Sequence, residues 1–211
     1  MTPIIAQAIL VLAVLALLVA EYRQSRVGVW LWKPVASVAF CTLAYVSGAF
    51  ATPYGVVIFV ALAMSLVGDV LLIPHNKASF MVGLFSFLGG HVAFAVAFYR
   101  RGVRLEWVGG AAVGLTILLV VIGRWLLPQV EKKMRGPVVA YMLVLSTMVA
   151  LAAGTVGAGA RPLVLVGALM FYVSDLSVAI DRFVKRAFIN RLWGLPLYYG
   201  AQLLFALSVG W

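Results

Sequence analysis

The sequence predicts an all-α, polytopic membrane protein with eight transmembrane helices in a single domain, residues 1–211. Of its 211 residues, 65% are hydrophobic and 10% are charged, whereas soluble domains are about 45–50% apolar and about 25% charged. The mean hydropathy is +1.12. A folded soluble domain exposes roughly a quarter to a third of the surface of its unfolded chain, so it could not hide this much apolar surface from water. These values exclude a soluble globular enzyme and a disordered chain.

Eight apolar runs have the length of a transmembrane helix, which is about 20 residues. The gaps between them are short, so no separate soluble domain is expected. The first run lacks a basic segment before it and is too long for the apolar part of a signal peptide, so it is interpreted as a membrane helix. The runs are Pro3–Ala20, Lys33–Phe50, Tyr54–Ile73, Ser79–Tyr99, Trp107–Leu127, Pro137–Gly157, Pro162–Ile180 and Trp193–Trp211.

Prolines and tryptophans mark the expected ends of these helices. Pro34, Pro137 and Pro162 each open a run, and proline is tolerated in the first turn of a helix because its missing N–H has no partner there. Tryptophan favours the interface between membrane and water, and all six tryptophans lie near run ends: Trp30, Trp32, Trp107, Trp125, Trp193 and Trp211.

The basic residues predict the orientation. The loops after the first, third, fifth and seventh runs hold twelve Lys and Arg residues, and the other loops hold four. The positive-inside rule therefore places the first set in the cytoplasm and both termini on the non-cytoplasmic side, in a membrane that we expect to be a bacterial inner membrane. The net charge of +10 fits loops that face an anionic membrane surface. No basic face with exposed aromatic residues is visible, so no nucleic-acid partner is predicted.

Two parts of the chain resemble each other. The segment 61–69 aligns with 167–175, which matches Asp69 with Asp175, and 90–95 aligns with 201–206, which matches His91 with Gln202. The match is short, and chance is the alternative explanation. A duplication would give two halves, residues 1–105 and 106–211, with four spans each. Because four is even, the halves would be parallel and related by an axis along the membrane normal, with the two aspartates at the same depth.

Asp69 and Asp175 are the polar residues whose placement inside the membrane costs the most free energy. Each lies within an apolar run, several residues from its end, where a carboxylate costs about 2.5–3.5 kcal/mol on insertion scales. No lysine or arginine lies in the same runs at that depth, which argues against an ion pair, while a hydrogen bond between packed helices remains the structural alternative. Two such residues at matching positions favour a buried functional cavity.

Other polar residues share helix faces or begin loops. His91 lies in the middle of its run, where either a packing hydrogen bond or a role in the site explains it. Tyr198 and Gln202 are four residues apart, so they share a face of the last helix. Asp181 begins a basic loop with Lys185 four residues later, which favours a simple ion pair.

Metal-ligating residues are scarce. The chain has two histidines and one cysteine, too few for a zinc site with three histidine ligands or for a thiolate cluster. His75 lies in an expected loop and is interpreted as inert. The sequence therefore predicts no metal and no other cofactor.

Several short motifs occur in order along most of the chain. They are Lys33-Pro34, Gly68-Asp69, Phe80-x-x-Gly83-x-x-x-Phe87-x-x-x-His91, Ser174-Asp175 followed by Asp181-Arg182-Phe183, and Tyr198-Tyr199-x-x-Gln202. Each motif is weak alone, but in this order they resemble the YhhN family, which is the family of the lysoplasmalogenases.

The resemblance implies eight membrane helices and hydrolysis of the vinyl ether bond of lysoplasmalogens to a fatty aldehyde and glycerophosphoethanolamine or glycerophosphocholine. Carried over position by position, the polar residues of the family are Lys33, Asp69, His91, Asp175, Tyr198 and Gln202. Of these, we expect Asp69 and Asp175 to be catalytic. One departure stands out, because Asp181 occupies a position where the family pattern leads us to expect asparagine. The residues that we expect to bind the lysophospholipid are Lys33, His91, Asp181, Arg182, Tyr198 and Gln202.

The chemistry of vinyl ethers fits a buried pair of carboxyl groups. Their hydrolysis begins with rate-limiting protonation of the β-carbon, and the oxocarbenium ion that forms is then attacked by water. The reaction needs a protonated acid and a negative charge beside the cation. Two buried carboxyl groups can share one proton and supply both, without a metal or a nucleophilic side chain. We therefore expect Asp69 and Asp175 to face one cavity, with the phosphate of the lipid near Lys33 or Arg182.

Two other classes of protein would use the same residues. A proton-coupled transporter also places carboxylates inside the membrane in repeated halves. A lipid-binding protein without enzymatic activity would instead tolerate the loss of both aspartates.

Overall fold

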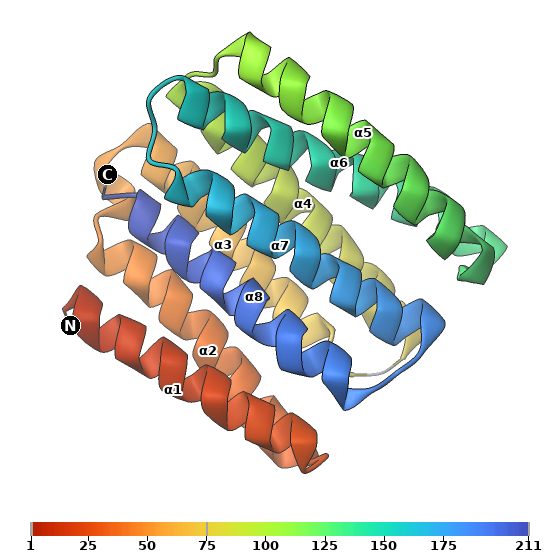
Figure 1. Cartoon of the computed structure of the whole chain (residues 1–211). Coiled ribbons are helices and arrows are strands. Elements are labelled where there is room, and N and C mark those ends of the chain that lie inside the picture. Colours follow the sequence, from red (N-terminus) through yellow and green to blue (C-terminus); the bar gives the residue numbers. More distant parts are fainter. Residues whose placement is uncertain (1, 75, 211) are drawn as a thin grey trace.

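Eight α-helices form nearly all of the described chain, as the sequence predicts (Figure 1). The structure is a computed structural model that describes residues 2–74 and 76–210, and these contain no strand. His75 and Trp211, the end of the last predicted run, lie outside the described residues. The helices are α1 (Pro3–Tyr22), α2 (Arg26–Val46), α3 (Pro53–Leu71), α4 (Lys77–Arg101), α5 (Leu105–Leu126), α6 (Lys132–Gly157), α7 (Leu163–Ala179) and α8 (Phe188–Ser208).

Seven of these helices, α1 to α7, are long and apolar enough to cross a membrane. The eighth, α8, has a similar length but carries polar residues such as Asn190, Arg191 and Gln202. It packs against α7, α2 and α1, so these neighbouring helices cover much of its polar face. The outer helices expose large aliphatic side chains, for example Ile117 and Val121 of α5, which suits contact with lipid. The chain is an integral, multi-pass membrane protein.

Three helices begin earlier than the hydropathy pattern predicts. Helices α2, α6 and α8 start at Arg26, Lys132 and Phe188, five to seven residues before the expected positions. Pro34 and Pro137 consequently lie inside α2 and α6 instead of at their starts. The first turns of these three helices are polar or basic, so a hydropathy pattern does not include them even though they are helical. The correction matters for Lys33, which lies inside a helix and not at its start.

The helix contacts have an approximate twofold character. The pairs α1–α2 and α3–α4 correspond to α5–α6 and α7–α8, and the contact between α2 and α8 corresponds to that between α6 and α4. This pattern is the one that a parallel duplication of four helices would produce. The correspondence is incomplete, since α1 also packs on α8, whereas α5 at the edge of the bundle (Figure 1) packs mainly on α6 in the described structure.

Both termini lie at one end of the bundle (Figure 1), as an even number of spans requires. At the opposite end, α7 continues into a π-helical segment, Ile180–Val184, before the short connection to α8. An ion pair between Lys77 and Glu131 joins the starts of α4 and α6 there. A hydrogen bond from Lys77 lowers the pKa of the exposed Glu131 carboxyl, so this carboxyl group is ionised at neutral pH.

Candidate active site

A cavity of about 440 Å³ lies between the helices near the end of the bundle that is opposite the termini. Its walls are of two kinds. One is apolar and includes one face of α6, where cavity-lining residues recur at helical spacing; it is formed by Leu84, Ile122, Leu126, Val138, Met142 and Leu145. The other carries the charges, and it includes Lys33, Asp69, Asp175, Asp181, Arg182 and Tyr198.

Asp69 of α3 is surrounded by donors. Its Oδ1 atom lies 3.3 Å from the ammonium nitrogen of Lys33. Its Oδ2 atom lies 2.7 Å from the Ser37 hydroxyl and accepts a hydrogen bond of 2.6 Å from Tyr198. Only 3% of the Asp69 side chain is exposed. Both carboxylate oxygens are therefore satisfied by neighbours from α2 and α8.

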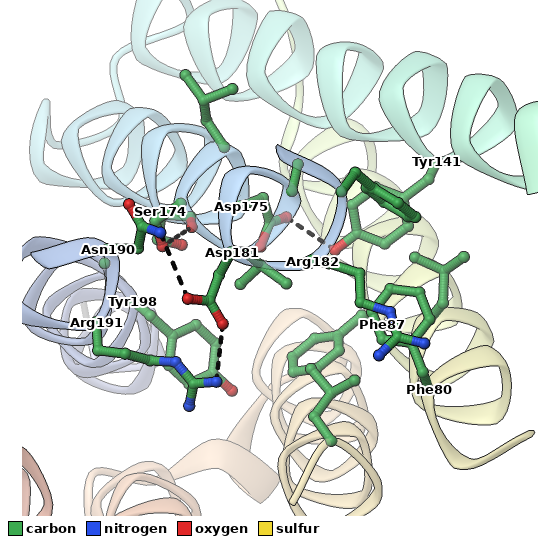
Figure 2. Close-up of a pocket in the computed structure, with 18 of the residues that line it drawn as sticks. Phe80, Phe87, Tyr141, Ser174, Asp175, Asp181, Arg182, Asn190, Arg191 and Tyr198 are labelled. Atoms are coloured by element: carbon green, nitrogen blue, oxygen red, sulfur yellow. Dashed lines mark hydrogen bonds and ion pairs between the residues drawn. The ribbon is translucent and has the colours of Figure 1, made fainter. Parts of the chain in front are cut away.

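Asp175 of α7 has fewer partners. Its Oδ2 atom accepts a hydrogen bond of 2.8 Å from Tyr141 and lies 3.1 Å from Nε2 of His91. His91 Nε2 is also 2.8 Å from the Tyr141 hydroxyl, so the three atoms form a triangle. Figure 2 shows Asp175 directed towards Tyr141 at the edge of the cavity. The side chain of Asp175 is 14% exposed, more than that of Asp69.

The two aspartates have corresponding surroundings. Each is bonded by a residue of the preceding helix pair in its own half, Ser37 of α2 for Asp69 and Tyr141 of α6 for Asp175. Each is also bonded by a residue from the other half, Tyr198 of α8 and His91 of α4 respectively. The two halves thus exchange partners across the cavity, and neither carboxylate has its full set of contacts without the other half.

A separate ion network holds the polar end of the cavity together. Arg191 of α8 lies 2.6 Å from Glu21 of α1 and 2.9 Å from Asp181 of the π-helical segment. The other Asp181 oxygen accepts hydrogen bonds from the Ala187 backbone and the Asn190 amide (Figure 2). Asp181 therefore binds the start of α8, and its partner is Arg191 rather than the expected Lys185.

Arg182 is placed by the π-helical segment. Its guanidinium lies over the ring of Phe80, 4.3 Å from the ring centroid (Figure 2). A cation on an aromatic face is held in position without losing its charge. Lys33 is paired with Asp69 and Arg191 with two carboxylates, whereas Arg182, which also lines the cavity, forms no ion pair with a carboxylate of the described residues.

The model of the YhhN family matches residues 28–209. The chain belongs to the YhhN family. Lysoplasmalogenase TMEM86A of Bos taurus is 34% identical over 157 residues, which are 72% of this chain and 64% of the relative. Lysoplasmalogenase TMEM86A of Homo sapiens is 34% identical over 166 residues, which are 75% of this chain and 67% of the relative. Lysoplasmalogenase TMEM86B of Rattus norvegicus is 34% identical over 153 residues, which are 70% and 59% of the two chains.

The chain therefore spans 59% to 67% of the length of these family relatives. No solved structure is significantly similar to it.

In this YhhN-family chain, most of the residues singled out from the sequence meet at the cavity. Asp69, Asp175 and Tyr198 line it together. Two others lie one layer behind the described wall: His91 contacts Asp175, and Gln202 donates a hydrogen bond of 3.0 Å to Tyr198. Both are fully buried, so their contacts with a bound lipid would pass through these neighbours.

Lys33 corrects one expectation from the sequence. Asp69 does have a basic partner in the membrane, but it comes from α2 and not from the same helix. Ser37 and Tyr141 were missed because a serine and a tyrosine in an apolar run are unremarkable by type. A signal existed for Ser37, which lies four residues after Lys33 and therefore shares its helix face.

Proposed function

We propose that this protein is a lysoplasmalogenase-like membrane hydrolase. It would cleave the vinyl ether bond of a lysoplasmalogen and release a fatty aldehyde together with glycerophosphoethanolamine or glycerophosphocholine. The observation that carries the proposal is that Asp69 and Asp175 line one cavity with a charged wall and an apolar wall. The names of the family relatives support the same reaction.

The two walls suit an amphiphilic substrate with one long chain. The alkenyl chain would lie along the apolar face of α6, near Met142 and Leu145, and the glycerol phosphate would lie at the charged end. Arg182 is the group proposed to bind the phosphate, because a guanidinium can donate two parallel hydrogen bonds to phosphate oxygens. The vinyl ether joins chain and glycerol, so it would lie at the boundary where the aspartates are.

The reaction needs acid catalysis and a stabilised cation. A carboxyl group gives its proton to the β-carbon, the π electrons of the double bond form the new C–H bond, and an oxocarbenium ion remains. Water then adds to the α-carbon and returns a proton to the carboxylate. The hemiacetal collapses when its hydroxyl loses a proton and the glycerol oxygen gains one, which breaks the C–O bond. The carboxylates would stabilise the cation in a site of low dielectric constant.

Purified protein in liposomes tests this function. Incubation with a lysoplasmenylethanolamine should yield a fatty aldehyde and glycerophosphoethanolamine in equal amounts, measured by mass spectrometry. The matched 1-alkyl lysolipid, which lacks the double bond, should remain intact because it cannot form the cation by protonation. Asp69→Asn and Asp175→Asn should each lower turnover by about 10²–10⁴-fold, while Glu106→Gln, an exposed carboxylate near Arg104, should not. Uptake of the lipid without cleavage would instead favour a proton-coupled transporter.

A further inference from the structure

The groups that face Asp69 favour its carboxylate form. Oδ1 faces the Lys33 ammonium, and Oδ2 faces the hydroxyl groups of Ser37 and Tyr198. The Tyr198 hydroxyl donates its proton to Asp69, and it accepts a hydrogen bond from the Gln202 amide. A carboxylate is the form of Asp69 that fits these donors.

Asp175 differs because one of its oxygens is free. The hydrogen bonds from Tyr141 and His91 both involve Oδ2. Oδ1 has no hydrogen-bond partner in the described part of the chain, and the side chain lines the cavity. A proton on Oδ1 would therefore face the space that the substrate would occupy.

The tautomer of His91 supports this arrangement. Its Nδ1 atom is buried and has no hydrogen-bond partner among the described residues, and a buried N–H without an acceptor is costly. The proton of neutral His91 is therefore on Nε2, where both Tyr141 and Asp175 can accept it. His91 then donates to Oδ2, as Tyr141 does, and the two donors together fix the rotation of the carboxyl group.

We propose that Asp175 donates the catalytic proton through its Oδ1 atom, whereas Asp69 stays a carboxylate throughout the reaction. This assignment rests on the proposed function, and it divides the roles between the two aspartates. Tyr141 and His91 are positioning residues, because they hold Oδ2 and stabilise the carboxylate that remains after proton transfer. In the step itself, the Oδ1–H bond breaks, a C–H bond forms at the β-carbon, and the water that adds to the α-carbon later returns a proton to Oδ1.

Chemical rescue distinguishes the two aspartates. Asp175→Ala removes the proton donor and leaves space, so added formic acid should restore aldehyde release in a concentration-dependent way. Asp69→Ala should not respond to formic acid. Since Asp69→Ala leaves Lys33 unpaired and can fail to fold, Lys33→Met/Asp69→Asn, which removes both charges, is measured beside it. Rescue of an Asp69 variant, or absence of rescue in Asp175→Ala, would overturn the assignment.

The positioning residues have their own test. Tyr141→Phe and His91→Leu should each lower kcat about 10- to 100-fold, the value of a hydrogen bond to a charged group, with KM little changed. His91→Gln should restore most of kcat, because a glutamine amide can donate to Oδ2 and glutamine already occupies the matching position, Gln202, in the other half. Tyr54→Phe, which removes a hydroxyl bonded to Ser208 far from the cavity, should leave kcat unchanged. Equal loss in His91→Gln and His91→Leu would contradict the positioning role.

Infrared spectroscopy tests the assignment without any substrate. The proton that we assign to Oδ1 of Asp175 should give a carboxyl C=O band that Asp175→Asn lacks and Asp69→Asn retains. The reverse pattern would overturn the assignment even if the enzyme hydrolyses vinyl ethers. A wild-type protein that releases no aldehyde would instead refute the proposed function and, with it, the catalytic part of this assignment.

Discussion

Replacing Lys33 by methionine should destabilise the protein strongly while leaving its shape nearly unchanged. The pair with Asp69 is short, 3.3 Å, and its side chains are 11% and 3% exposed. Coulomb attraction at this distance is about 5 kcal/mol at an effective dielectric constant of about 20. The unpaired carboxyl group of the variant can avoid being a buried charge by binding a proton. For an aspartate of ordinary acidity, this protonation costs about 4 kcal/mol at pH 7. We therefore expect a loss of about 3–4 kcal/mol, within the range for broken buried pairs.

The assay is reversible unfolding in mixed detergent micelles, followed by circular dichroism. Lys33→Met/Asp69→Asn should regain most of the loss, because removing both charges leaves no uncompensated carboxylate, and Lys133→Met, an exposed lysine, should change stability by less than about 0.5 kcal/mol. The loss in Lys33→Met should shrink as the pH is lowered, because Asp69 is then protonated in the unfolded chain as well. A loss below about 1 kcal/mol, or a double variant no more stable than Lys33→Met, would refute the reasoning.

Three further predictions concern topology, metal and head group. A reporter fused after the last residue should report the non-cytoplasmic side, because the loops at the cavity end carry most of the positive charge; a cytoplasmic signal would reverse the orientation. Aldehyde release should persist in EDTA, because two histidines and one cysteine provide too few ligands for a zinc site; loss of activity that zinc restores would contradict this. Arg182→Gln should raise KM about 10- to 100-fold for the phosphorylated lysolipid and have no effect with an alkenylglycerol that lacks phosphate. A similar rise in KM for both substrates would show that Arg182 does not bind the phosphate.

The sequence predicts the membrane class and the number of helices well because burial in lipid imposes long apolar runs. It predicts helix ends poorly where a helix continues beyond the apolar run. The first turns of α2 are basic and aromatic, and Pro34 resembles a helix start, so the hydropathy pattern places Lys33 at the very beginning of the helix. The structure instead places Lys33 in the third turn of α2 beside Asp69.

The candidate site is partly visible in the sequence for a related reason. Asp69, Asp175 and His91 are conspicuous because a polar side chain in an apolar run is costly. The residues that contact them depend on how the helices pack against one another, and a hydropathy pattern carries no information about this packing. Tyr141 is 34 residues from Asp175 along the chain, and nothing in its own run distinguishes it from an interfacial or core tyrosine. That both aspartates lie at one depth, as the alignment of the two halves implies, stays a prediction, although both line the same cavity.

The central claim is that a carboxyl group of this cavity protonates a vinyl ether, and hydrolysis in heavy water tests it most directly. Protonation of the β-carbon would place one deuterium on the carbon next to the aldehyde, because the new C–H bond receives its hydrogen from solvent through the carboxyl group. Mass spectrometry of the trapped aldehyde should therefore show one added deuterium that stays with the carbon chain. An aldehyde without deuterium at this position, or no aldehyde from the wild-type protein, would contradict the account.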